Sequence, residues 1–464
     1  MKKKICHLAV AVTMLFAFNS CNTKADPDTP LKFSTLTVEQ QKSAIEKNGL
    51  DLADKITGFQ QTQGYVTLTQ FINYDRGSYA PSIISSISQL CANLKTNDVN
   101  ALENFNKQLR VASNVGTDVW GTWTWNSKTK RFDKASGVVI NKAVLNFPAN
   151  DLNSSVNNAV LTILYTESNT LIPNVNPAEF YPKSISVILK VDNTEALNAQ
   201  YSGSYTTDGT PTNLLQTLIV GAYNWSATLT NTNTDVSANY TLKYNKDVLM
   251  KYDIGATGNF NATTITNSNS QVQDVITTGH MSIQLMNVAI YGGITDVKAF
   301  VKEVNVLKPD SIIHEGQYYS WTEHVYGKSY RDSEVLIFNK YLKFYGYFAT
   351  ENQKFADVEF FTSEEQGIDY NTPSTLVYTQ TSTNYYPNPP STLKYDYYNW
   401  SDTYNYTTNN YDYTFKYYAY GTKTVYNAEP RLILSDGSKI TDLNTYANDN
   451  FKTLITKFSS LFSN

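Results

Sequence analysis

The sequence predicts an α+β protein with an N-terminal helical segment, a long curled antiparallel β-meander and a C-terminal helix that docks on the body. Three patterns carry this prediction. Apolar residues recur at helical spacing from Thr37 to about Val111, alternation with period two begins at Val119 and recurs between turns, and Tyr446–Phe462 has one apolar face. Strands of about ten residues in such number cannot stay flat, so we expect a half-barrel, barrel or sandwich.

The composition excludes several classes of protein. The chain has 464 residues, of which 41% are hydrophobic and 17% charged, and its formal net charge is −4. This hydrophobic fraction is enough for a sizeable core, whereas the weakly acidic balance lacks the basic face that a nucleic-acid-binding protein needs. Because the only long apolar run lies at the N-terminus, we do not expect a multi-span membrane protein.

Residues 1–20 have the layout of a lipoprotein signal peptide. Lys2–Lys4 precede an apolar stretch, Leu8–Phe18, that is too short to span a bilayer. The segment Phe18-Asn19-Ser20-Cys21 resembles a bacterial lipobox, in which the cysteine is acylated and the chain is cut just before it. Serine fits the small-residue position, and phenylalanine stands where leucine is usual. We therefore expect lipidation of Cys21; the alternative is an ordinary signal peptide with an incidental cysteine.

Residues 21–30 form a polar tether with two prolines. A lysine followed by spaced acids just after Cys21 is similar to the surface-export signal of Bacteroidota lipoproteins. The resemblance implies a lipid-anchored outer-membrane protein, with the membrane as its partner and the cell surface favoured over the periplasmic face. A plain linker facing the periplasm is the alternative.

Residues 31–112 form the predicted helical segment. Thr37-Val38-Glu39-Gln40 matches a capping box, with Gly49 as a weak point in the helix that follows. Further short helices are expected at Val66–Tyr74, Ile83–Leu94 and Val99–Leu109. The lone Cys91 is expected to be a small buried apolar residue.

Residues 113–308 form the predicted meander and its closing helix. Trp120–Trp125 alternates, Asn126–Thr129 is a turn and Lys130–Lys134 returns, which together predict a hairpin. The later strands are expected at Val138–Phe147, Ala159–Thr166, Ser184–Val191, Glu195–Thr206, Leu214–Val220, Tyr223–Asn231, Asp235–Tyr244, Val248–Ala256 and Met281–Tyr291. A helix capped by Thr295 is expected over Thr295–Val306.

Residues 309–464 form a tyrosine-rich β region that ends in the docking helix. Strands are expected at Glu334–Phe338, Tyr341–Ala349 and Arg431–Leu434. Tyr370–Tyr426 holds fifteen of the 35 tyrosines, and its alternation fits strands better than disorder. Whether this region is a separate domain stays open.

Several segments together resemble uncharacterised outer-membrane or surface lipoproteins of Bacteroidota. They are the lipobox start, the hairpin Thr122-Trp123-Thr124-Trp125-Asn126…Phe132, Val144-Leu145-Asn146-Phe147-Pro148 and Leu434-Ser435-Asp436-Gly437-Ser438. The likeness covers most of the chain loosely, and the family carries no catalytic motif that can be transferred. The tyrosine-rich stretch lies outside that pattern.

No catalytic or metal motif rises above the background. His314 and His324, each beside a glutamate, match no compact ligand spacing for zinc. There is no Gly-x-Ser-x-Gly elbow, and Gly292-Gly293 is a pair rather than a phosphate loop. Glycoside hydrolysis needs two close carboxylates, which could come from Glu359, Glu364 and Glu365. We expect no cofactor, no metal and no catalytic residue.

Aromatic residues are the strongest functional signal, because tyrosine and tryptophan offer a flat apolar face with a polar edge. The candidate ligand-binding residues are Tyr385, Tyr386, Tyr397, Tyr398, Trp400, Tyr404 and Tyr406. The competing interpretation is cross-strand packing. For Trp120, Trp123 and Trp125 we favour core packing. Asp310-Ser311-Ile312 resembles the O-glycosylation signal of exported Bacteroidota proteins, so Ser311 is a candidate modification site in a loop-like position.

These observations predict a binding protein rather than an enzyme. The favoured function is binding of a glycan or another macromolecule through exposed aromatic residues. One alternative is a carrier of lipid or another apolar ligand in a curled sheet covered by helices, an analogy at the level of the fold. The other alternative is a glycoside hydrolase-like enzyme.

Overall fold

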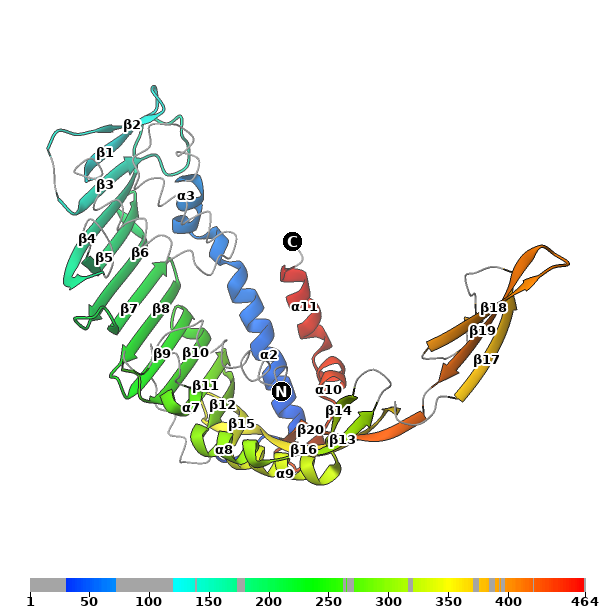
Figure 1. Cartoon of the computed structure of the whole chain (residues 1–464). Coiled ribbons are helices and arrows are strands. Elements are labelled where there is room, and N and C mark those ends of the chain that lie inside the picture. Colours follow the sequence, from blue (N-terminus) through cyan, green and yellow to red (C-terminus); the bar gives the residue numbers. More distant parts are fainter. Residues whose placement is uncertain are drawn as a thin grey trace. The chain divides into compact units, whose positions relative to one another are not determined.

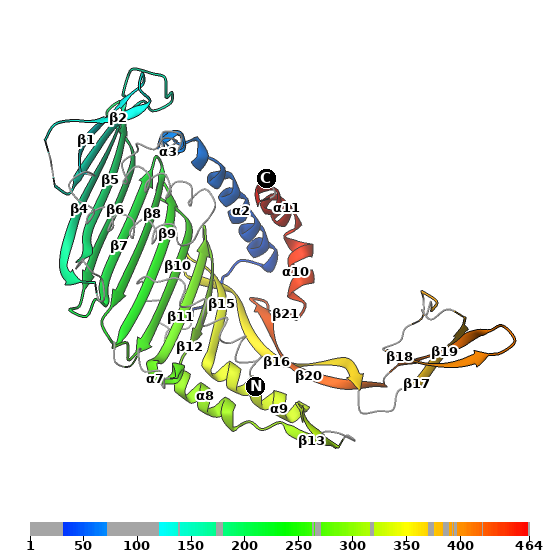
Figure 2. The same ribbon diagram turned by 45° about the horizontal axis from the view of Figure 1, so that its top comes forward.

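A computed structural model describes residues 31–71, 120–137, 140–172, 180–261, 264, 271–315, 320–369, 375–383, 389–391, 393, 397–419 and 421–462 (Figures 1 and 2). The helices are α2 (Val38–Thr57), η1 (Phe59–Gln61), α3 (Gln63–Phe71), α7 (Val272–Val275), α8 (Val297–Val306), α9 (Lys328–Tyr341), α10 (Leu443–Asn450) and α11 (Lys452–Phe462). Within these ranges, no helix combines the length and the apolar character that a membrane span requires.

Most strands belong to one open sheet of sixteen, in the order β2-β1-β3-β4-β5-β6-β7-β8-β9-β10-β11-β12-β15-β16-β20-β21. Their bounds are β1 (Gly121–Asn126), β2 (Arg131–Lys134), β3 (Lys142–Phe147), β4 (Ala159–Leu171), β5 (Phe180–Val191), β6 (Thr194–Tyr205), β7 (Pro211–Val220), β8 (Tyr223–Asn231), β9 (Asp235–Tyr244), β10 (Asp247–Gly258), β11 (Ile276–Leu285), β12 (Val288–Ile294), β15 (Leu342–Phe348), β16 (Gln353–Asp369), β20 (Gly421–Leu434) and β21 (Lys439–Ile440). Pairing is antiparallel except between β1 and β3. The predicted meander is therefore present, but the sheet does not close into a barrel.

The chain divides into two compact units. The first takes in the described residues up to Val301 together with Tyr341–Glu359 and Arg431 onward, and the second takes in Lys302–Lys340 and Phe360–Pro430. Helices and meander of the first unit are thus one body, although they are distant in the sequence.

Alternation of apolar and polar residues builds the core of the first unit. In β4, Ala159, Leu161, Ile163 and Tyr165 are buried, and the residues between them are more exposed. Phe71 of α3 packs against Phe147 and Phe132 in the same core. Trp120 and Trp125 are buried there too, and Trp123 is partly buried against it, which confirms core packing for these tryptophans.

The N-terminal helices run along one row of hairpin turns. In both views α2 lies beside the ends of β8–β12 (Figures 1 and 2). Along α2, Gln41 Nε2 donates to Ser435 Oγ, Asn48 Oδ1 accepts from Asn287 N, and Lys55 Nζ lies 2.6 Å from Asp247 Oδ2. These contacts reach the β20–β21, β11–β12 and β9–β10 turns in that order, which is the reverse of the strand order in the sheet. Before α2, Ser34 N donates to Lys354 O of β16, and in α3 Gly64 lies against Ala196 of β6. The Thr37–Gln40 capping box starts α2 as predicted. The segment from residue 34 to α3 thereby contacts turns and strands along much of the sheet.

The C-terminal helix docks as predicted, but in two pieces. α10 ends at Asn450, and α11 packs against α2, where Lys457 Nζ lies 2.5 Å from Asp54 Oδ1. Gly49, the predicted weak point, does not interrupt α2. The Leu454 side chain of α11 lies close to the helix backbone at this residue.

The second unit contains α9, two small sheets and the adjoining parts of β16 and β20. Strands β13 (Asp310–Glu315) and β14 (Ser320–Val325) form a two-stranded sheet. Strands β17 (Thr375–Ser382), β18 (Tyr397–Asn405) and β19 (Asn410–Ala419) form a three-stranded sheet in the order β17-β19-β18. The described residues of the tyrosine-rich stretch are thus largely strand, as the alternation predicts.

Three local predictions are wrong. The predicted strand Met281–Tyr291 is two strands, β11 and β12, separated by a turn in which Met286 has a φ of 53°. The predicted strand Glu334–Phe338 lies inside α9. The cap of α8 is Asp296, whose Oδ1 accepts a hydrogen bond from Ala299 N, whereas Thr295 Oγ1 bonds Tyr341 O. The helices predicted at 83–94 and 99–109, and Cys91, lie outside the described residues.

Candidate binding surface

The three-stranded sheet gathers aromatic rings on one of its faces. Antiparallel pairing places Tyr398 opposite Tyr417, Trp400 opposite Phe415 and Tyr404 opposite Tyr411 on adjacent strands. Because side chains alternate along a strand, these residues share one face. We call this surface the aromatic face; it consists of Tyr378, Tyr398, Trp400, Tyr404, Tyr411, Tyr413, Phe415 and Tyr417.

The centre of the aromatic face is packed like a core. Phe415 and Tyr417 of the middle strand are 1% and 0% exposed. Ring centroids lie 5.6 Å apart between Tyr398 and Tyr417 and 5.8 Å apart between Tyr378 and Tyr417. The Tyr417 hydroxyl donates to Gln380 Oε1 at 3.2 Å, which satisfies its buried polar atom. These residues fit the cross-strand packing interpretation.

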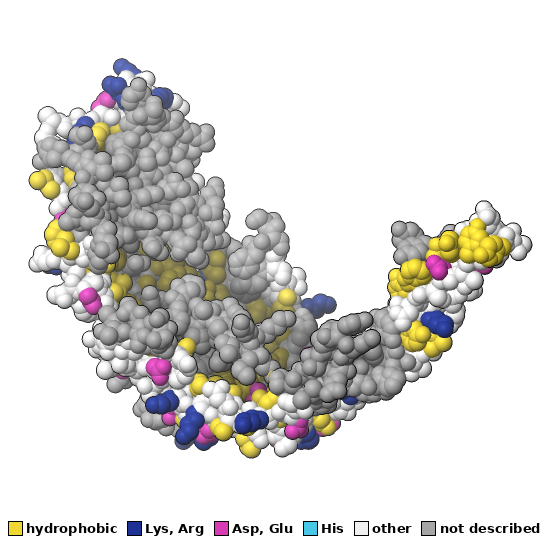
Figure 3. All heavy atoms as spheres, in the orientation of Figure 1, with side chains coloured by type: hydrophobic (Ala, Val, Ile, Leu, Met, Phe, Trp, Pro, Cys, Tyr) yellow, Lys and Arg dark blue, Asp and Glu magenta, His cyan; other side chains and the backbone are white. Residues whose placement is uncertain are grey.

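The flanks of the aromatic face are open to solvent. Tyr398, Trp400 and Tyr411 are 42%, 46% and 44% exposed. Trp400 lies 6.1 Å from Tyr413, and Tyr404 lies 5.1 Å from Tyr411, measured between ring centroids. Figure 3 shows hydrophobic side chains gathered over this sheet. Rings held by buried neighbours yet open on one side are suited to stacking against a ligand.

A turn carries one more ring beyond the strands. Asn405 Oδ1 accepts hydrogen bonds from Thr407 N and Thr408 N, and Asn409 has a φ of 52°, so the β18–β19 connection is a tight turn built on asparagines. Tyr406 in this turn is 89% exposed, and its ring meets that of Tyr404 edge to face at 5.0 Å. The turn therefore extends the aromatic face at the tip of the hairpin.

The structure brings together four of the predicted ligand-binding residues. Tyr398, Trp400 and Tyr404 lie on the aromatic face, and Tyr406 lies beside it. Tyr397 begins β18, where its backbone pairs with that of Tyr418. Three further predicted residues, Cys21, Tyr385 and Tyr386, lie outside the described residues.

Sequence reasoning missed the other half of this surface. Tyr378, Tyr411, Tyr413, Phe415 and Tyr417 were not predicted to belong to a site. The alternation Tyr-x-Tyr-x-Phe-x-Tyr over 411–417 was the available signal, because it requires four aromatic side chains on one face of a strand.

Ser311 lies in strand β13, not in a loop. Its backbone pairs with that of His324, and its side chain is exposed. The exposure leaves the residue accessible to modification, whereas the strand pairing restricts the backbone. His314 pairs with Trp321 in the same hairpin, so the two histidines are not register partners. Among the described residues, no group of three or more histidine, cysteine or acidic side chains could hold a metal ion.

A second candidate site, a cluster of polar and aromatic side chains, lies on the large sheet. Register places Asp253, Ser282, Tyr291 and Tyr345 opposite one another on β10, β11, β12 and β15. Stacked rings connect the cluster: Tyr291 lies 4.7 Å from Tyr345 and 6.1 Å from His280. Asp253, Ser282 and Tyr291 are buried.

Burial dominates the electrostatics of this second cluster. It lowers the pKa of His280, and the Asp253 carboxylate opposes that shift. It also raises the pKa of Tyr345, with a further rise from Tyr291, and raises the pKa of Tyr347. Burial therefore favours the neutral form of His280, which stacks on Tyr291, and a Cβ at Gly255 would lie 2.8 Å from its Nε2. Such packing favours a structural role.

The carboxylates considered for hydrolysis have structural partners. Glu359 Oε2 lies 2.7 Å from Arg431 Nη2 and 3.5 Å from Lys439 Nζ, and its hydrogen bond with Arg431 lowers the pKa of the carboxyl. Glu365 accepts a hydrogen bond from Asn427 Nδ2. These partners fit a structural role for both carboxylates.

Two hollows among the described residues of the first unit are small and partly polar. One, of about 300 Å³, is lined by Gln63, Val191, Asp192, Thr194, Glu195, Ala196 and Gly221. Its carboxylates accept hydrogen bonds from Asn158 and Asn198. Another, of about 210 Å³, lies beside Asn287 and Phe348. Neither offers the large apolar cavity of a lipid carrier.

The aromatic face is therefore the best candidate site among the described residues. Comparison of the chain with known protein families, curated proteins and solved structures finds no match.

Proposed function

We propose that this protein is a non-catalytic glycan-binding protein whose ligand stacks on the aromatic face. One observation carries the proposal: exposed rings at Tyr398, Trp400 and Tyr411 surround the buried pair Phe415 and Tyr417. The buried pair fixes the exposed rings in place, so binding costs little side-chain entropy.

The chemistry of the surface suits sugars better than lipid. A pyranose ring has an apolar face of C–H groups and a rim of hydroxyls, whereas tyrosine has an apolar ring and a hydroxyl at its edge. Stacking of the two apolar faces leaves both polar rims free to hydrogen bond. A lipid tail would leave the tyrosine hydroxyls without partners.

Trp400 makes the proposal directly testable, since it is the only tryptophan in the three strands of this sheet. Soluble glycan oligomers should change tryptophan fluorescence and give binding heat in calorimetry. Trp400→Ala and Tyr411→Ala should each weaken binding on the order of tenfold or more, because each removes one stacking platform.

Thr403→Ala is the matched control, because Thr403 pairs with Asp412 and lies on the opposite face of the same strand. It should leave affinity unchanged. A wild-type protein that binds no glycan of a broad panel, or a Trp400→Ala variant that binds as well as wild type, would refute the proposal.

Lipid attachment at Cys21 completes the proposal and rests on the sequence of residues 1–21 alone. It would hold the aromatic face near the outer membrane, with the cell surface favoured. Metabolic labelling with palmitate should mark the native protein, and Cys21→Ser should abolish the label. An unblocked N-terminus at another residue would contradict the anchor.

A further inference from the structure

We infer that the glycan bound by the aromatic face carries free amino groups, and that Asp402 recognises them. This inference rests on the proposed function and narrows its ligand from glycans in general to cationic amino-sugar chains.

The first step is the position of Asp402. Its Cα is paired with that of Tyr413, and it alternates with Trp400 and Tyr404 along β18. Strand alternation therefore places the carboxylate on the aromatic face, between the exposed Trp400 and the partly exposed Tyr404. Asp402 is exposed, and it forms no ion pair with any residue that the structure describes.

The second step is the charge of the whole face. The three strands contain three charged residues: Asp402, Asp412 and Lys416. Asp412 and Lys416 pair with Thr403 and Asn399, so they lie on the opposite face. Asp412 Oδ2 also accepts a hydrogen bond from Asn405 Nδ2. In these strands, the aromatic face therefore has one charge, and it is negative.

The third step is the chemistry of a complementary ligand. The faces of tyrosine and tryptophan rings are negative and attract cations, and Asp402 adds a full negative charge beside them. An amino sugar offers an apolar ring for Trp400 and an ammonium group for Asp402 at the same time. Uronic acid or sulfated sugars would bring like charges together, with no described cation on this face to compensate.

The experiment compares oligomers of equal length on the full-length protein. Glucosamine, N-acetylglucosamine and galacturonic acid oligomers are titrated by calorimetry at two salt concentrations. We expect the glucosamine oligomer to bind on the order of tenfold more tightly than the N-acetylated one. Added salt should reduce this preference.

Two isosteric variants locate the recognition. Asp402→Asn should reduce the preference for glucosamine to about threefold or less, which the ring faces alone can supply. It should leave binding of the N-acetylated oligomer within about twofold, since stacking is retained. Asp412→Asn makes the same charge change on the opposite face and should leave the preference intact.

The outcomes separate the two proposals. The amino-sugar inference is overturned, while glycan binding stays in place, by any of three results: equal affinity for charged and acetylated oligomers, a preference for galacturonate, or a preference for glucosamine that Asp402→Asn does not reduce. An oligolysine peptide that binds as tightly as the glucosamine oligomer also overturns it, in favour of a cationic peptide. Failure of all glycans to bind overturns both.

Discussion

Gly49 of α2 faces Leu454 of α11 so closely that a Cβ atom at position 49 would lie 2.7 Å from Leu454 Cδ2. The Leu454 side chain occupies the space that a side chain at residue 49 would need. A glycine in mid-helix lowers helix stability by about 1 kcal/mol relative to alanine. The packing of Leu454 against α2 offsets part of this loss.

We predict that the effect of Gly49→Ala on stability depends on the side chain at residue 454. In the wild-type background the overlap with Leu454 cancels the gain in helix propensity, and stability should stay level or fall. In a Leu454→Ala background the same change should stabilise by about 1 kcal/mol. A double-mutant cycle in urea measures the coupling, and additive effects would contradict the contact.

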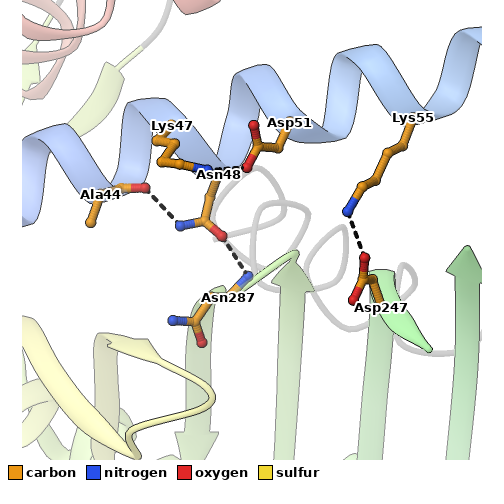
Figure 4. Close-up of polar contacts among 7 residues, drawn as sticks. All are labelled: Ala44, Lys47, Asn48, Asp51, Lys55, Asp247 and Asn287. Carbon is orange, nitrogen blue, oxygen red and sulfur yellow. Dashed lines mark hydrogen bonds and ion pairs between the residues drawn. The ribbon is translucent and has the colours of Figure 1, made fainter.

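We predict that Asn48 contributes more to stability than Lys55, although both connect α2 to the sheet (Figure 4). Asn48 is half-buried; its Oδ1 accepts from Asn287 N at 3.0 Å, and its Nδ2 donates to Ala44 O. Asn48→Ala leaves the Asn287 amide without this acceptor and should cost about 1–3 kcal/mol. Lys55→Met breaks a partly exposed ion pair with Asp247 and should cost under about 1 kcal/mol. Chemical denaturation gives both values; equal losses would refute the ranking.

We predict that Arg331→Met destabilises the second unit more than Glu334→Gln. The two side chains are only 12% and 11% exposed and lie 2.5 Å apart. Arg331 also stacks over Tyr326 and Tyr330, and its Nε donates to Tyr426 O. Arg331→Met leaves the Glu334 carboxylate buried without its partner and should cost about 3–5 kcal/mol. Glu334→Gln should cost less, because the Arg331 guanidinium keeps its contacts with the two tyrosine rings and with Tyr426 O. Thermal unfolding should rank the variants, and the reverse order would contradict this account.

We predict that His280 makes the first unit less stable as the pH falls below 7. Burial lowers the pKa of His280 in the folded protein below its ordinary value of 6.5, so the unfolded chain takes up the proton first. The stability contributed by the neutral imidazole is therefore present above that ordinary pKa and is lost as acid is added through it. His280→Gln should make the unfolding midpoint depend less on pH between pH 7 and 5. If the midpoint of the variant falls with pH as steeply as that of the wild type, the effect is excluded.

We predict that Phe415→Ala disrupts the three-stranded sheet, because Phe415 is fully enclosed among aromatic rings. A buried phenylalanine truncated to alanine costs about 3–5 kcal/mol. Protease should then cleave within residues 375–419 faster than in wild type, while Thr414→Ala on the opposite face of β19 serves as the control. Equal cleavage of both variants would show that Phe415 does not hold the sheet together.

Sequence patterns predicted most of the large sheet because each strand there alternates and ends at a recognisable turn. Strands β8 and β9 have the predicted bounds. The turn between β11 and β12 was not predicted, because Met286 is not a typical turn-forming residue although it adopts a positive φ. Helix α9 was not predicted because its apolar run resembles a strand. The spacing of Lys328 and Asp332, which form an i, i+4 ion pair, is typical of helices.

The candidate site was predictable only in part. Aromatic content pointed to Trp400 and its neighbours, and alternation pointed to a strand over 411–417. Strand order could not be derived, because β17 pairs with β19 rather than with β18, the next strand along the chain. That register brings Tyr378 and Asp402 onto one surface, and local patterns carry no information about it.

The path of α2 across the hairpins sets an order of events during synthesis. Gln41 leaves the ribosome long before Ser435, its hydrogen-bond partner 394 residues later. The contact between α2 and Ser435 can therefore form only after nearly the whole chain has been translated, whereas the contacts with Asp247 and Asn287 can form earlier. Contacts between such distant residues slow folding, so the hairpins that are translated first can dock on α2 before the last one is made.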